Sequence, residues 1–84
     1  MKGQEKHKAE ILKSVVVENH KKKSEMVFIM MGDTYKGVTL YKVYSMSKED
    51  GGNIGIKDTE DTYNERIANH YFNLLISTYL RKNN

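Results

Sequence analysis

Cysteine, proline and tryptophan are all absent from this 84-residue chain. Without cysteine there is no disulfide framework, no thiol nucleophile and no cysteine-based zinc site. The chain must therefore be held together by one small hydrophobic core. Without proline there is also no proline-rich linker to divide the sequence. We expect a single domain over residues 1–84, with residues 1–7 flexible.

Long hydrophobic runs are missing as well. The longest one is the six-residue run at positions 26–31, which has the length of a strand and is far short of a membrane span. The first eight residues carry positive charge with no apolar stretch behind it, which is unlike a secretory signal. We therefore expect a soluble, cytoplasmic protein with no membrane partner.

Positive charge is concentrated near the start of the chain. The formal net charge is +3, and residues 1–23 hold seven lysines against three glutamates, whereas the rest is close to neutral. Lysine outnumbers arginine twelve to two. This bias indicates an AT-rich coding sequence, as in low-GC bacteria and their phages.

Three segments in the middle of the chain predict strands of an antiparallel sheet. Residues 26–31 are apolar on both faces, which is typical of a central strand. Residues 38–46 alternate, and a glycine-bracketed turn at residues 32–37 joins the two segments. The polar, glycine-rich residues 48–53 predict a hairpin loop leading into a short strand at residues 53–57.

The alternating segment predicts which side chains face the core. We expect one face to be buried and the other to be partly wet. The predicted core face holds Val38, Leu40, Tyr44 and Met46. The predicted wet face holds Thr39, Tyr41, Val43 and Ser45.

Residues 8–20 fit two structures. Ala9, Leu12 and Val15 recur at helical spacing. However, residues 15–17 are three consecutive valines, whose β-branched side chains favour a strand. We expect a strand over residues 12–19 after a short helical or irregular lead-in, and a helix remains the alternative.

The C-terminal segment predicts a long helix over residues 60–81. Residues 62–65 match a capping box, in which the Thr62 hydroxyl and the Glu65 carboxylate cap the first turn. Acidic residues at 58, 60 and 61 precede the helix and basic residues at 81 and 82 end it, as the helix dipole favours. The predicted core-facing side chains are Tyr63, Ile67, Tyr71, Leu74, Leu75 and Thr78, and the same apolar arc ends at Ala68.

These elements together predict an α+β fold. Its antiparallel meander sheet has three or four strands, and the long C-terminal helix packs on one face. A short N-terminal helix precedes the sheet in the alternative arrangement of residues 8–20.

No pattern for catalysis, a metal or a cofactor is present. The glycines match neither a P-loop nor a dinucleotide-binding spacing. His7, His20 and His70 do not fall at metal-ligand spacing on any one predicted element. We interpret His70 as a half-buried helix residue and the acidic cluster at 58–65 as helix-dipole complementarity. We therefore predict a protein that is not an enzyme, with no cofactor and no metal site.

Apolar side chains outside the core-facing arc of the predicted helix indicate a protein partner. Phe72 lies at the edge of that arc, and Ile76 and Leu80 fall beyond it. The leading prediction is a small protein-binding module that regulates or inhibits a larger protein, encoded by a phage or mobile element. Self-association is a second use of the same surface, and the alternative is that the N-terminal segment covers it.

The lysines give a second candidate function. Lys21, Lys22 and Lys23, together with Lys13, could contact phosphates in a salt-sensitive way. Tyr41 on the predicted wet face could stack on bases. The alternative function is therefore a nucleic-acid-binding accessory protein.

Overall fold

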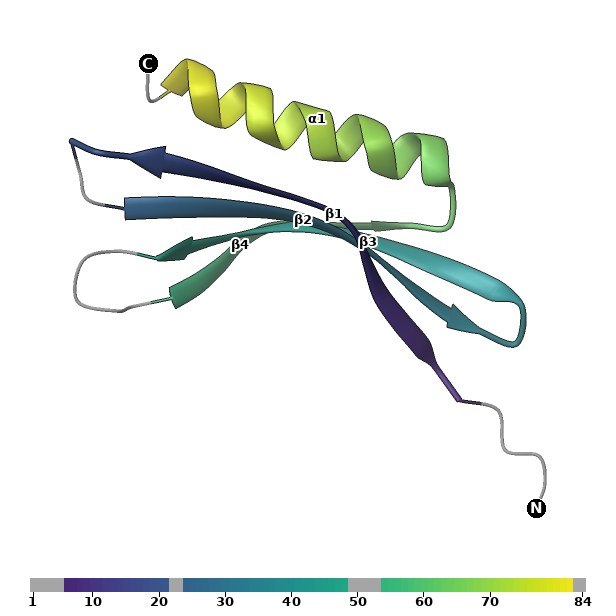
Figure 1. Ribbon diagram of the computed structural model, residues 1–84. Coiled ribbons are helices and arrows are strands. Elements are labelled where there is room, and N and C mark those ends of the chain that lie inside the picture. Colours follow the sequence, from purple (N-terminus) through teal and green to yellow (C-terminus); the bar gives the residue numbers. More distant parts are fainter. Residues whose placement is uncertain (1–5, 22–23, 49–53, 83–84) are drawn as a thin grey trace.

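The computed structural model describes residues 6–21, 24–48 and 54–82. They form four strands and one helix: β1 (Lys8–Asn19), β2 (Ser24–Tyr35), β3 (Val38–Lys48), β4 (Ile54–Thr62) and α1 (Glu65–Lys82). Every neighbouring pair of strands is antiparallel, in the order β1-β2-β3-β4. Helix α1 lies across one face of this sheet (Figure 1). The predicted α+β meander is confirmed.

β1 is a strand along its whole length, and the expected helical lead-in is wrong. Its pairing with β2 extends from Lys8, opposite Thr34, to Asn19, opposite Ser24, with one irregularity between Ile11 and Lys13. Ala9 and Leu12 are good helix formers, but the helix propensities of residues other than glycine and proline differ by less than about 1 kcal/mol per residue, and backbone pairing with a long neighbouring strand outweighs that preference.

β2 continues straight through the first part of the predicted turn. Gly32 lies inside the strand, where an added Cβ would come within 3.2 Å of Thr39 Cγ2 and 3.4 Å of Leu12 Cδ1. The turn itself is only Lys36 and Gly37, with φ angles of 52° and 77°. Positive φ at both central residues is typical of the tight hairpin turn whose twist matches that of the strands.

The boundary between β4 and α1 also differs from the prediction. Pairing with β3 continues to Thr62, opposite Tyr41, so residues 58–61 belong to β4, and α1 begins only at Glu65. Asn64, and not Thr62, caps α1: its Oδ1 accepts hydrogen bonds from the backbone N–H groups of Arg66 at 2.9 Å and Ile67 at 3.2 Å. The Thr62 hydroxyl oxygen accepts one from the Asn64 N–H at 3.1 Å.

The core lies between α1 and the sheet. It is a cluster of five buried side chains, Phe28, Met30, Val43, Ala68 and Phe72. The partly buried residues packed against it are Val17, Met26, Tyr41, Tyr71, Leu75, Ile76 and Tyr79.

The helix covers the face of β3 that the sequence predicted to be wet. Val43 is fully buried in the core, and Tyr41 packs against it. Val38, Leu40, Tyr44 and Met46 therefore lie on the other face, so the prediction for this strand is wrong. The alternation in β3 correctly divides its side chains between two faces. However, β2 is apolar on both sides, so the sequence does not indicate which face of the sheet the helix covers.

The buried side of α1 is also displaced from the predicted arc. Ala68 is buried and lets the helix approach the sheet closely, whereas Ile67 and Leu74 are exposed. Successive helix positions are about 100° apart, so a helix seated on Ala68 turns Ile67 to its flank. Tyr63, also predicted in the core, is exposed.

The molecule is unusually thin for its length. Its principal extents are 53 × 28 × 15 Å, and its radius of gyration is 15.2 Å. A compact chain of this length has a radius of gyration of about 12 Å. The difference follows from a long, two-layered fold in which only one face of the sheet carries a helix.

Candidate functional site

The sheet face opposite α1 is the main candidate site, and we call it the open face. Directly opposite residues on paired strands share a face, so the pairings of Ile29 with Tyr44 and of Val27 with Met46 place all four side chains there. No element formed by the described residues covers this face (Figure 1). Its apolar members are Ile11, Val16, Val27, Ile29, Met31, Val38, Leu40, Tyr44 and Met46.

The rim of the open face exposes large aliphatic side chains to water. The exposed fractions are 61% for Ile11, 56% for Val16 and 54% for Val38. Two of these residues lie on the edge strand β1, and the third lies next to the β2–β3 turn. An apolar surface therefore extends from one end of the sheet to the other.

The centre of the open face is well packed although no helix lies over it. Ile29 is buried by its neighbours on the sheet alone. The Tyr44 hydroxyl donates a hydrogen bond to Met31 Sδ at 3.8 Å, across the β2–β3 pair. The face is thus an ordered surface and not a fringe of loose side chains.

Charges of both signs lie on the open face. Glu25 lies between Lys48 on β3 and Glu18 on β1, and Lys42 lies opposite Asp61. Opposite positions on neighbouring strands share a face, so acids and bases are interspersed there. The open face therefore carries no strong field of a single sign at these positions.

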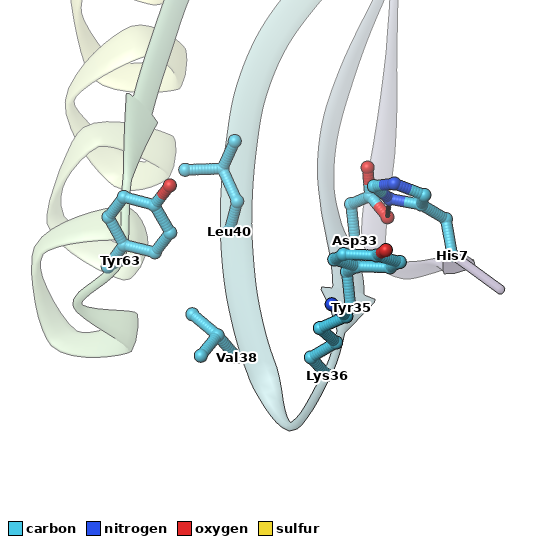
Figure 2. Close-up of a pocket in the computed structure, with 7 residues that line it drawn as sticks. All are labelled: His7, Asp33, Tyr35, Lys36, Val38, Leu40 and Tyr63. Atoms are coloured by element: carbon cyan, nitrogen blue, oxygen red, sulfur yellow. Dashed lines mark hydrogen bonds and ion pairs between the residues drawn. The ribbon is translucent and has the colours of Figure 1, made fainter. Parts of the chain in front are cut away.

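A cavity of about 340 Å³ lies at the end of the open face beside the β2–β3 turn. Its lining residues are His7, Asp33, Tyr35, Lys36, Val38, Leu40 and Tyr63. Figure 2 shows Tyr63, Leu40 and Val38 on one side of the cavity and the other residues on the opposite side. The aliphatic and aromatic groups make this a pocket suited to an apolar side chain.

One wall of the cavity is a stack of three side chains. The His7 ring lies on the Tyr35 ring, with centroids 4.3 Å apart and planes inclined by 12°. Lys36 Nζ is 5.3 Å from the centroid of the Tyr35 ring. His7 Nδ1 is also 3.0 Å from Asp33 Oδ1. His7, predicted to be part of a flexible tail, thus contacts the strand beside it, and residues 1–5 lie outside the described residues.

The predicted partner-binding residues on the helix do not form one exposed strip. Phe72 is buried in the core and Ile76 packs against it, so only Leu80 of the three is exposed. Because the helix is seated on Ala68, the apolar side chains on its outer flank are instead Ile67 and Leu74. A role for these helix residues in binding stays a prediction.

The residues proposed for nucleic-acid binding are also separated. Lys21 is exposed, whereas Lys22 and Lys23 lie outside the described residues. Lys13 is exposed and contacts α1: its Nζ donates a hydrogen bond to Asn69 Oδ1 and lies 5.8 Å from the Phe72 ring centroid.

Tyr41 packs against the core on the helix side, so its expected place on a wet face is wrong. Of the described residues, Tyr41, Lys13 and Lys21 are thus not brought together on one free surface.

Sequence reasoning named four of the nine apolar open-face residues, Val38, Leu40, Tyr44 and Met46, but placed them on the core face. The signal that could have identified the face was the equal apolarity of both sides of residues 26–31, combined with one helix only. A single helix covers one face of a sheet, so the second apolar face must remain uncovered in the isolated chain.

The described residues offer no obvious site for a metal ion and no membrane-crossing helix. Within residues 6–21, 24–48 and 54–82, no three histidine, aspartate or glutamate side chains group closely enough to hold a metal. The helix in that part of the chain is not long and apolar enough to cross a membrane. No family model, curated protein or solved structure matches the chain.

Proposed function

We propose that the protein is a non-enzymatic protein-binding module and that the open face is its binding surface. The observation that carries this proposal is an ordered, apolar face of the sheet that no described element covers. Monomeric soluble proteins rarely expose a continuous apolar patch of more than a few hundred Å². A patch of this kind is typical of a surface that is buried against another protein.

The size of the open face supports the proposal. Strands of 9–12 residues make up the sheet. Four such strands, about 4.8 Å apart with a rise of about 3.3 Å per residue, span roughly 700 Å². Standard protein–protein interfaces bury about 800 Å² on each partner, so the whole open face is the right size for one interface.

The cavity beside the β2–β3 turn supplies a place for an anchoring side chain. Its 340 Å³ would accept an aromatic or large aliphatic group against Val38, Leu40 and Tyr63. Binding energy at interfaces is usually concentrated in such buried anchors, while the surrounding contacts exclude water. The cavity and the flat apolar surface together provide both parts of this arrangement.

Site-specific photo-crosslinking tests the proposal. Tyr44, in the middle of β3, is replaced with azidophenylalanine, which keeps an aromatic ring on an interior strand of the open face. The matched control carries the same group at Leu74, an exposed position on the outer flank of α1. Both proteins are irradiated in the source cells, and the products are separated after nuclease treatment.

We expect discrete protein adducts at position 44 and only a diffuse background at position 74. A regulator or inhibitor of a larger protein would yield that protein as the adduct. Equal yields at both positions, or adducts that disappear with nuclease treatment, would contradict the proposal. The second result would favour the lysine-based alternative.

A further inference from the structure

We propose that the occupant of the open face is a second copy of this chain, so that the two sheets pack face to face with both helices outside. The inference rests on the proposed function, because it uses the same surface. Sheets packed in this way lie about 10 Å apart and share an apolar core between them. The result would be a four-layered dimer in the order helix, sheet, sheet, helix.

The area of the open face suits a second copy. The four strands of 9–12 residues span roughly 700 Å². This area is close to the 800 Å² or so that each partner contributes to a stable interface.

The core of the isolated chain is small. Among the described residues, six apolar side chains are buried, and five of these form the cluster under α1. The sixth, Ile29, lies on the open face and is covered only by its own sheet. A second copy on this face would enlarge the buried core, and a second copy is available wherever the chain is made.

The pattern of the open face suits contact with itself. A two-fold dimer brings the same patch of each copy together, so the patch must complement itself in shape and charge. The face is apolar at its centre, and its paired positions Glu25 and Lys48, and Lys42 and Asp61, hold both signs of charge. Two copies therefore meet without the repulsion that a face of one sign would cause.

The β1 edge of the sheet is a less suitable place for self-association. β1 is an edge strand, but Lys8 and Lys13 lie along it, and its pairing is irregular between Ile11 and Lys13. Lysines and bulges are the usual features that prevent two sheet edges from pairing.

Substitutions at two neighbouring valines of β1 distinguish packing through the open face from pairing through the β1 edge. Val16 lies on the open face, opposite Val27, whereas Val15 lies on the helix side, opposite Phe28. Both are exposed, to 56% and 37%. Val16→Lys places a charge in the proposed interface of each copy, and Val15→Lys places the same charge on the same edge strand outside it.

Sedimentation equilibrium of the purified proteins is the test. We expect the unaltered chain and Val15→Lys to have twice the 9.8 kDa monomer mass. Val16→Lys should raise the dimer dissociation constant by at least about tenfold, because the two-fold symmetry places the added charge against the apolar partner face twice. Equal weakening by both substitutions, or by neither, would overturn face-to-face packing.

Thiol labelling keeps the inference testable if Val16→Lys fails to fold. The chain has no cysteine, so Val16→Cys and Val15→Cys each provide a single reactive group. The inference predicts that labelling at position 16 slows as protein concentration rises, whereas labelling at position 15 does not. Equal concentration dependence at the two positions would overturn it.

The two proposals can fail separately. A monomeric purified protein that still forms a crosslink to a different protein at position 44 would refute the second-copy inference and keep the proposed function. A monomer with no crosslink at that position would refute both.

Discussion

Replacing Phe72 with alanine tests most sharply which side of α1 faces the sheet. Phe72 is only 4% exposed and lies in the cluster with Phe28, Met30 and Val43. The Lys13 ammonium group is 5.8 Å from the centroid of its ring. The substitution therefore removes the largest side chain that the helix contributes to the core, together with one cation–π contact.

The expected loss of stability follows from these contacts. Truncating a buried phenylalanine to alanine typically costs about 3–5 kcal/mol, because apolar burial is lost and a cavity remains. The lost cation–π contact adds roughly 0.5–1 kcal/mol. A chain of 84 residues has a total free energy of unfolding of only about 4–13 kcal/mol. Phe72→Ala should thus remove a large part of that stability.

Urea unfolding followed by circular dichroism measures this loss. The control is Leu74→Ala, two positions along the same helix, where the side chain is 46% exposed. We expect a cost of less than about 1 kcal/mol there, since surface substitutions are usually near neutral. All variants are compared at one protein concentration. A larger loss for Leu74→Ala than for Phe72→Ala would refute the observed orientation of α1 and restore the predicted one.

Three further substitutions test local features of the fold. Asn64→Ala should lower the free energy of unfolding by about 1 kcal/mol because it removes the cap of α1. The control Asn73→Ala, at an exposed helix position, should leave it unchanged. Equal effects of the two substitutions in urea unfolding would exclude Asn64 as the cap. Gly37→Ala should cost about 1–2 kcal/mol because φ is 77° there, and an unchanged urea midpoint would contradict the tight turn. Gly32→Val should lower the melting temperature, since an added Cβ already comes within 3.2 Å of Thr39 Cγ2, and an unchanged melting temperature would show that the strand has room.

The strands and the helix could be predicted because each has a clear local pattern. Residues 26–31 are continuously apolar, the valines at 15–17 are β-branched, and the last quarter of the chain has helical periodicity. Short polar turns between these segments then favour a meander. These signals depend on residues close together in the sequence, and the fold class follows from them.

The choice of faces could not be predicted because it depends on packing between distant segments. Both sides of β2 are apolar, so Val43 and Tyr44 on β3 were equally plausible core residues until the helix position was known. Helix α1 packs on the sheet through the small Ala68, and this packing likewise buries Phe72 and exposes Ile67. Two of the three residues predicted to bind a partner, Phe72 and Ile76, therefore lie at the core. The open face of the sheet was not identified.

The choice of the residue that caps the helix also depends on a contact with a distant segment, although the two candidate residues are close together in the sequence. The residues at 62–65 match a capping box, but Asn64 can also cap a helix. Pairing of Thr62 with Tyr41 keeps Thr62 in β4 and leaves Asn64 as the first residue free to cap. A contact with a strand some twenty residues away in the sequence thus decides between two local patterns.

The most direct test of the central claim is the ratio of crosslinking yields at positions 44 and 74 in the source cells. The open face predicts a discrete protein adduct at Tyr44, in the centre of the sheet, and no comparable product at Leu74, on the outer flank of α1. An adduct confined to position 74, with position 44 unreacted, would contradict the claim and return the binding site to the helix.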